Sequence, residues 1–277
     1  MLYGIDKLAC AGLLFMVASC SGNDAAKVEA ESLYESALVA QRAGRPAEAI
    51  AILDSLDANY KSQTEIIRKS IDLRPLLIVD YGTQQLDSLD TAMELMKHDA
   101  DSIGAKLTFV SLPSVDGYYI ETSRHNPKFT NTTGISPRVS YGGEFYLVSS
   151  VNPSGSLHHS SISLTVDGQT AVSGEVPYDG AVNYRYGNSE LITFSTEKSA
   201  EIGRLAFEHR NSPAELKFIG DGGRAKTLRL SVAEVNGMAT LYEYSVLVGN
   251  SRTAAIEKER IQKKIELARS KVRPVAN

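Results

Sequence analysis

The chain has 277 residues, of which 43% are apolar, so it can form one large or two modest globular domains. Its formal net charge of −4 argues against nucleic-acid binding, because such proteins usually carry a basic surface. Cys10 and Cys20 are the two cysteines, and both lie near the beginning of the sequence. The rest of the chain therefore has to be stabilised by burial rather than by disulfides.

A short apolar stretch near the beginning predicts a secretory signal. Leu8–Ala18 follows Lys7 and is too short to cross a membrane, which takes about 20 residues. It leads into Val17-Ala18-Ser19-Cys20, a pattern of one apolar residue, two small residues and a cysteine. This pattern resembles the lipid-attachment signal of bacterial lipoproteins, although that family most often has leucine at the apolar position. The resemblance implies that residues 1–19 are removed and that acyl chains on Cys20 hold the protein on a membrane.

Residues 20–30 have the small polar composition of a flexible, lipidated tether. No second apolar run of spanning length follows, so no transmembrane helix is expected. The outer membrane is the expected location, because Ser21 rather than an acidic residue follows the cysteine. The alternative is an ordinary cleaved signal in which Cys20 is incidental.

The composition changes near residue 107 from helix-forming residues to Tyr, Val, Thr, Ser and Gly, which predicts an α+β protein with separate helical and β parts. Residues 31–106 are expected to form a helical stalk. Within it, Gly44-Arg45-Pro46 breaks residues 31–60 into a helical hairpin, and a third helix is expected to end before Pro75. The hairpin resembles one tetratricopeptide-type unit, with a plain hairpin as the alternative. The matching residues are Tyr34, Ala37, Gly44, Pro46, Glu48, Ala49 and Ile50.

Two segments carry seams of residues spaced alternately by three and four. The first seam is Leu86, Leu89, Met93, Met96, Ala100, Ile103 and Leu107. The second seam is Ala254, Lys258, Ile261, Ile265, Ala268 and Val272. The first segment is mainly acidic and the second mainly basic, which favours their pairing. We therefore expect a C-terminal helix, residues 250–277, to pack back on the helix at 76–106. The alternative is a free basic helix that lies on an anionic membrane or another protein.

Residues 107–249 predict an antiparallel β-sandwich or jelly-roll-like domain, because short alternating runs are separated by turn sequences such as Val166-Asp167-Gly168. The expected strands are 107–110, 117–121, 138–142, 144–151, 160–166, 171–176, 181–186, 190–196, 204–209, 214–219, 226–235 and 239–248.

The sequence contains no pattern that predicts catalysis, a metal site or a cofactor site. The histidines lack zinc-ligand spacing on a helix, and the adjacent His158 and His159 would point to opposite faces of a strand. Glu175 and Asp179 have the residue types of a glycosidase pair, but Pro177 between them indicates a loop. We therefore expect no enzyme activity, no metal and no cofactor.

Tyrosine is the residue type that indicates binding, because aromatic side chains bind sugars and peptides and are favoured at interfaces. The candidate ligand-binding residues, near loops and strand ends, are Tyr118, Tyr119, Tyr178, Tyr184 and Tyr186. The alternative is that these rings cover the sandwich core and leave their hydroxyls at its rim.

Together these features predict a lipid-anchored cell-envelope protein without catalytic activity, which serves protein interaction or envelope structure. We expect an envelope protein as its partner and no nucleic acid. The layout resembles Bacteroidota-type envelope lipoproteins that combine a helical part with a β-domain. The alternative function is glycan or peptide binding by the sandwich.

The anchor is tested by labelling cells with a fatty-acid analogue. We expect the wild-type protein to incorporate the label and to sediment with membranes, because the acyl chains are attached to the Cys20 sulfur. The Cys20→Ala variant should lose both properties, whereas Cys10→Ala should keep the label. Equal labelling of wild type and Cys20→Ala would contradict the anchor.

Overall fold

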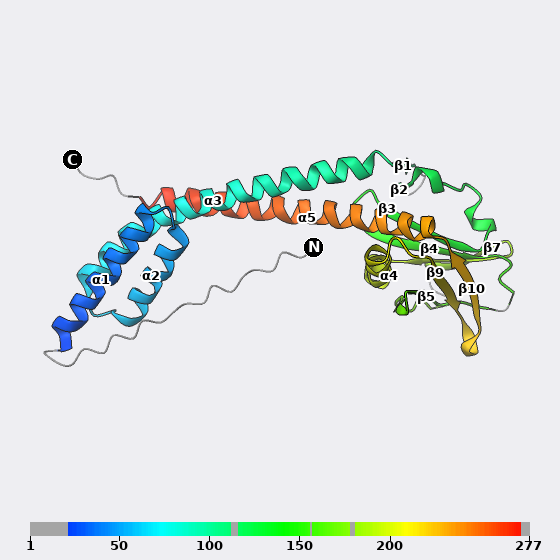
Figure 1. Ribbon diagram of the computed structural model, residues 1–277, viewed down its shortest axis with the longest axis horizontal. Helices are drawn as coiled ribbons and strands as arrows, with labels where there is room; N and C mark the ends of the chain where they lie inside the picture. Colours follow the sequence, from blue (N-terminus) through cyan, green and yellow to red (C-terminus); the bar gives the residue numbers. More distant parts are fainter. Residues whose placement is uncertain (1–21, 112–115, 156, 178–180, 273–277) are drawn as a thin grey trace. The chain divides into compact units, whose positions relative to one another are not determined.

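The computed structural model describes residues 22–111, 116–155, 157–177 and 181–272 (Figure 1). These residues form two compact units. One contains the described residues up to Asp87 together with those from Glu259 onward, and the other contains the described residues from Ser88 to Lys258. The signal segment 1–19 and Cys20 lie outside the described residues. No helix among the described residues is long and apolar enough to cross a membrane.

The first unit is helical. Its hairpin consists of α1 (Gly22–Arg42) and α2 (Pro46–Asn59), and the first part of α3 (Thr64–Gly104) packs against both. The turn between α1 and α2 contains Gly44 at a φ of +69°, a conformation that glycine adopts without strain. The shared core of the three helices is Ala37, Ala40, Ala49, Leu53, Leu73 and Leu77. The helical hairpin expected from the sequence is therefore confirmed.

Two expectations for this unit are wrong. The flexible tether at 20–30 is replaced from Gly22 onward by α1, because Ala30 is buried against Leu56 and Ile66. The helix end expected before Pro75 is absent, since α3 continues through this proline. Proline removes a backbone hydrogen bond from a helix, but here Pro75 is itself buried, and its neighbours Leu73 and Leu77 belong to the core.

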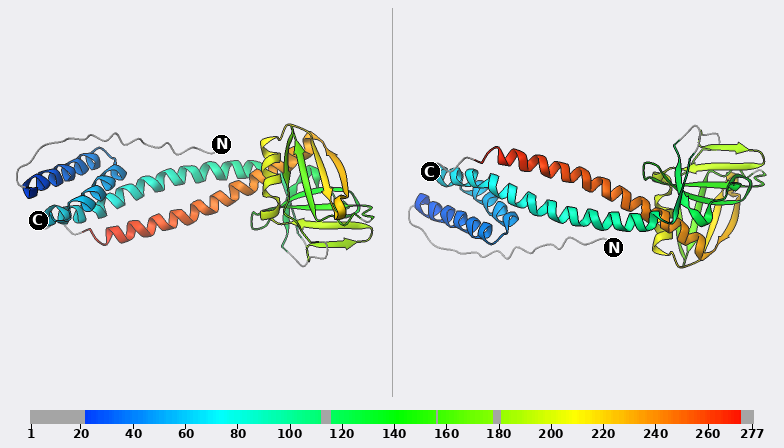
Figure 2. Two further views of the ribbon diagram at one scale, coloured as in Figure 1. Left: turned by 90° about the horizontal axis from the view of Figure 1, so that it is seen from below. Right: turned by 90° about the horizontal axis from the view of Figure 1, so that it is seen from above.

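The predicted pairing of the C-terminal helix with the long helix is confirmed. The helix α5 (Val232–Arg269) runs beside α3, as both views in Figure 2 show. In the helical unit, Ile261 and Ile265 of α5 lie against Gly82 of α3, where an added Cβ would be 2.7 Å from Ile265 Cγ1. The glycine therefore allows a close approach of the two helices.

The charged part of the seam belongs to the other unit. Lys258, the polar member of the second seam, forms an ion pair of 2.5 Å with Asp90 of α3. Ala254 is buried in the same seam, whereas Val272 lies beyond the end of α5 and is exposed. Opposite charge and heptad spacing therefore act together, as expected for paired helices.

The second unit contains two antiparallel sheets that form a sandwich. One sheet has the order β1-β2-β3-β4-β8-β7, and the other has the order β10-β9-β5-β6. The strands of the six-stranded sheet are β1 (Leu107–Val110), β2 (Tyr118–Glu121), β3 (Gly134–Ser140), β4 (Phe145–Val151), β7 (Asn183–Tyr186) and β8 (Ser189–Phe194). Those of the four-stranded sheet are β5 (Ser161–Val166), β6 (Gln169–Val172), β9 (Ala214–Ile219) and β10 (Ala225–Leu230).

A single apolar cluster joins the two sheets. Phe145, Leu147 and Ile192 come from the six-stranded sheet, and Leu164 and Phe218 come from the four-stranded sheet. The helix α4 (Thr196–Glu208) and the first turns of α5 complete the cluster with Ile202, Leu205, Val235, Met238 and Leu241. The β-domain therefore depends on two helices for its closed core.

The strands expected at 204–209 and 239–248 are wrong, because 204–208 belong to α4 and 239–248 to α5. The strand expected at 226–235 is correct only as far as Leu230, since α5 begins at Val232. The alternating aromatic and β-branched residues of 239–248 indicate a strand locally, but burial at helical spacing decides the outcome.

A reciprocal cap begins α5 well before residue 250. The Ser231 backbone N–H donates to Glu234 Oε2 at 2.7 Å, and the Glu234 backbone N–H donates to Ser231 Oγ at 3.3 Å.

The helix pairing is tested by removing buried methyl groups from α5. Ile265→Ala should lower the free energy of unfolding by about 2–4 kcal/mol, because this side chain is 5% exposed and packs against α3. Ile256→Ala is the matched control, since Ile256 lies on the same helix but is 70% exposed, and it should change stability by about 0.5 kcal/mol or less. Urea unfolding followed by circular dichroism measures both changes, and equal losses would contradict the pairing.

Candidate functional site

The candidate site lies on the outer face of the six-stranded sheet, the face that does not contribute to the apolar cluster. Successive side chains of a strand point to opposite faces, so Phe145 and Leu147 enter the core while Tyr146 and Val148 point outward. Residues 122–133, with the short helices η1 (Thr122–Arg124) and η2 (Phe129–Asn131), form a loop near this face, and η2 contacts β4 and β8. Two cavities lie beside this loop.

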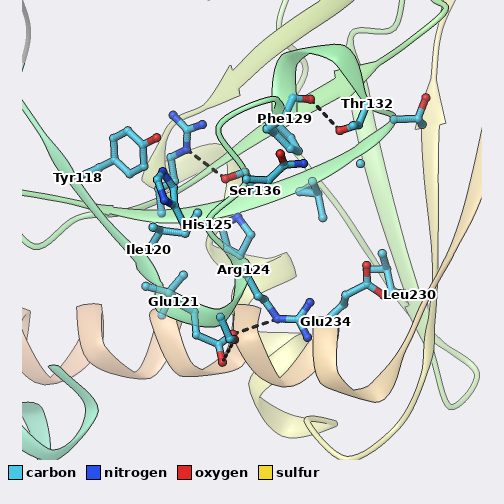
Figure 3. Close-up of a pocket in the computed structure, with 18 of the residues that line it drawn as sticks. Tyr118, Ile120, Glu121, Arg124, His125, Phe129, Thr132, Ser136, Leu230 and Glu234 are labelled. Atoms are coloured by element: carbon cyan, nitrogen blue, oxygen red, sulfur yellow. Dashed lines mark hydrogen bonds and ion pairs between the residues drawn. The ribbon is translucent and has the colours of Figure 1, made fainter. Parts of the chain in front are cut away.

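The first cavity has a volume of about 250 Å³ and is drawn in Figure 3. Tyr118 and Phe129 line one end, whereas Glu121, Arg124 and Glu234 lie at the other end, beside α5. Leu228, Leu230 and Leu241 add apolar walls. The cavity therefore has an aromatic end and a charged end.

Each charged side chain at this end has a partner within the protein. Glu121 Oε2 and Arg124 Nε form an ion pair of 3.0 Å, although both atoms are buried and their angle does not make a hydrogen bond. They pack on Gly237 of α5, where an added Cβ would lie 2.4 Å from Glu121 Oε2. Glu234 is occupied by its cap with Ser231. Glu121 and Arg124 therefore compensate each other's charge, whereas Glu234 serves as a helix cap, so all three have structural roles.

The second cavity has a volume of about 380 Å³, within the range typical of ligand sites. Tyr118, Arg138, Val148, Leu191 and Thr193 form its wall on the sheet, and Tyr184 on β7 adds an exposed ring. The loop contributes His125, Asn126, Pro127, Phe129 and Thr130. The two cavities share Tyr118, His125, Asn126, Phe129 and Arg138.

Arg138 is held in a fixed position between these cavities. Its guanidinium carbon lies 4.1 Å from the centroid of the Tyr118 ring, and its Nε donates a hydrogen bond of 3.1 Å to Ser136 Oγ. The register of β3 and β4 places Tyr146 opposite Arg138. Burial raises the pKa of the Tyr146 hydroxyl, while the charge of Arg138 acts in the opposite direction. The arginine therefore lies between aromatic side chains of two neighbouring strands, Tyr118 on β2 and Tyr146 on β4.

The structure brings two of the five candidate tyrosines together. Tyr118, 8% exposed, and Tyr184, 48% exposed, line the second cavity. Tyr119 points to the other face of β2, where its ring packs 5.0 Å from Phe109 and 5.9 Å from Tyr244. Tyr186 lies on the edge strand β7, and Tyr178 lies outside the described residues.

A buried Ser–His–Glu group crosses the sandwich. Ser149 Oγ is 2.8 Å from His159 Nε2, and His159 Nδ1 is 2.7 Å from Glu190 Oε2. The backbone N–H groups of His158 and His159 also donate to Glu190. These contacts are those of a hydrolase triad, but all three side chains are fully buried, so no substrate reaches the hydroxyl in this conformation. Ser149 and Glu190 lie on the six-stranded sheet and His159 precedes β5, so the group connects the two sheets.

Burial and hydrogen bonding shift both titrating groups of this cluster. Burial lowers the pKa of His159 below its ordinary value of 6.5, despite the neighbouring carboxylate. For Glu190, burial acts to raise the pKa, but hydrogen bonds from the His159 ring and from two backbone N–H groups outweigh it, so the pKa falls below 4.5. A neutral imidazole beside an ionised carboxylate is therefore the stable state near neutral pH.

Sequence reasoning missed Arg138, His125 and the Ser149–His159–Glu190 group. No local pattern marks them, because each environment is assembled from separate strands and loops. The adjacent histidines His158 and His159 were the sequence feature that could have drawn attention to the buried group. Their side chains point in different directions, as expected: His158 Nδ1 lies 3.1 Å from Asp221 Oδ2, whereas His159 enters the core. Neither residue lies in a strand, and His158 has a φ of +49°.

Among the described residues, no group of three or more His, Cys, Asp or Glu side chains is placed to hold a metal ion. Asp179, one member of the pair considered for glycoside hydrolysis, lies outside the described residues. Comparison of the chain with protein-family models, curated proteins and solved structures finds no match in any of the three.

The buried group predicts acid destabilisation. A histidine and a glutamate with lowered folded-state pKa values contribute stability that is complete above their ordinary values. The histidine contribution is lost as pH falls below about 6.5, and that of the glutamate below about 4.5. We expect the free energy of unfolding to fall between pH 7.5 and pH 5, because the unfolded chain binds the extra proton.

His159→Gln should lose about 1–3 kcal/mol at pH 7.5 and show a flatter pH dependence, because glutamine does not titrate. His98→Gln is the control, since His98 is 83% exposed on α3 and its replacement should leave the curve unchanged. Parallel pH curves for wild type and His159→Gln would contradict this role of the buried histidine.

Proposed function

We propose that the protein is a non-catalytic, lipid-anchored envelope protein that binds a glycan in the cavity of about 380 Å³ on the outer face of its six-stranded sheet. The sequence suggested a structural or interaction role, with glycan or peptide binding as the alternative. Our proposal favours ligand binding by the β-domain over a purely structural role. A protein partner in the envelope remains part of the proposal, as does anchoring in the outer membrane through Cys20.

The carrying observation is that Tyr118 and Tyr184, from separate strands, line one cavity. The C–H face of a sugar ring stacks on an aromatic face, and a side chain with a polar tip can also hydrogen-bond to sugar hydroxyls. Asn126, Thr130 and Thr193 add amide and hydroxyl groups to the same lining. Apolar surface with a few placed polar groups is the usual composition of a small-molecule site.

Binding without chemistry is supported by the state of the nucleophile. Ser149 has a histidine and a glutamate in the required order, but its hydroxyl is fully buried. A nucleophile has to reach the reacting atom, so this group fits a structural role better than a catalytic one.

The experiment is to isolate the anchored protein from membranes and to measure co-purifying carbohydrate by hydrolysis and mass spectrometry. We expect carbohydrate with the wild type and about 3- to 10-fold weaker retention by Tyr184→Ala, because one stacking surface is lost. Tyr141→Ala is the matched control, since Tyr141 is 71% exposed and does not line either cavity.

Carbohydrate no higher than for an unrelated lipoprotein would contradict glycan binding. A photo-crosslinking residue at position 184 separates the remaining possibilities. Crosslinks to one envelope protein, with no carbohydrate, would transfer the function to protein interaction.

A further inference from the structure

We infer that the glycan carries a carboxylate, as in a uronic acid, and that Arg138 binds this group. This inference rests on the proposed function and specifies its ligand class. The inference depends on the position of Arg138 in the cavity wall and on the lack of acidic residues among the described lining of that cavity.

Arg138 differs from the other half-buried arginines among the described residues. Arg74 pairs with Asp57 at 2.6 Å, Arg124 with Glu121 at 3.0 Å, and Arg210 with Glu243 at 2.9 Å. Within the described ranges, no ion pair joins Arg138 to a carboxylate. Its neighbours are instead the Tyr118 ring, the Ser136 hydroxyl and Tyr146 on the adjacent strand.

The lining of the second cavity also contains basic side chains without acidic ones. It contains one arginine and one histidine, Arg138 and His125, and none of its described lining residues is acidic. The protein as a whole carries a net charge of −4, yet no carboxylate of the described residues lines this cavity. The first cavity differs because Glu121 and Glu234 lie at its charged end.

The setting of Arg138 is suited to a carboxylate. The guanidinium is planar and presents its donors as a fork that matches two carboxylate oxygens. Tyr118 and Ser136 restrict its orientation, so little side-chain freedom is lost when a ligand binds. A partly buried charge without an acid partner is costly, and a ligand carboxylate would remove that cost.

The other residues that line the second cavity favour a sugar acid over other carboxylate ligands. Tyr184 offers an exposed ring beside the same cavity, and Asn126, Thr130 and Thr193 offer groups that bind hydroxyls. A uronic acid combines a ring with a C–H face, several hydroxyls and one carboxylate. These features match the aromatic, polar and cationic parts of the lining.

The test is an oligosaccharide array that pairs uronic-acid oligomers with the same oligomers after reduction of their carboxyl groups. The full-length protein should bind the acidic member of a pair about 10- to 100-fold more tightly, because a charge-assisted hydrogen bond is lost on reduction. Arg138→Gln should remove this preference, and Arg138→Lys should retain part of it, since lysine keeps the charge but not the fork.

Arg229→Gln is the control variant, because Arg229 is an exposed residue of β10 outside both cavities, and it should leave binding unchanged. Equal affinity for acidic and reduced oligomers would overturn the inference and leave glycan binding intact. Absence of binding to every oligosaccharide would overturn both. Binding of peptides with a free C-terminal carboxylate, but not of amidated peptides or sugars, would keep the role of Arg138 and overturn the sugar assignment.

Discussion

The apolar cluster between the two sheets is the feature on which the β-domain depends. Both sheets contribute to it, and α4 and the beginning of α5 close it. Met238 and Leu241 of α5 enter this cluster. The packing of these two side chains places Gly237, the residue before Met238, against the Glu121–Arg124 pair. The same packing that closes the core therefore also sets one end of the first cavity.

Two polar centres of the β-domain contrast in how fully they are satisfied. The Ser149–His159–Glu190 group is fully buried, and every member has a short hydrogen bond. Such a group adds directionality to an apolar interior, since it tolerates few arrangements of the sheets that carry it. Arg138 instead lies at a cavity wall, where its guanidinium faces the Tyr118 ring and forms no ion pair within the described residues. A fully buried and hydrogen-bonded group is typical of a structural role, whereas a cation at a cavity wall is typical of a ligand-binding site.

Structural features that follow from a repeating spacing of residues were predictable from the sequence. Sites built from residues far apart in the sequence were not. The heptad seams identified the pairing of α3 with α5, because that spacing creates one continuous face. The Lys258–Asp90 ion pair within it was not predicted. The beginning of α5 was missed although Ser231 and Glu234 form a capping box, since the following β-branched residues favour a strand locally. Tyr118 could be nominated by its residue type. Arg138 could not, because its surroundings come from β2, β3 and a loop whose contacts no spacing reveals.

The ends of the two sheets have a consequence for how the protein behaves at high concentration. Three of the four edge strands, β1, β6 and β7, are four residues long, and the fourth, β10, carries Lys226 and Arg229. Short or charged edges offer a poor template to a strand of another molecule. A surface crowded with copies of this protein would therefore resist edge-to-edge aggregation, even though Phe109 and Val172 expose apolar side chains at those edges.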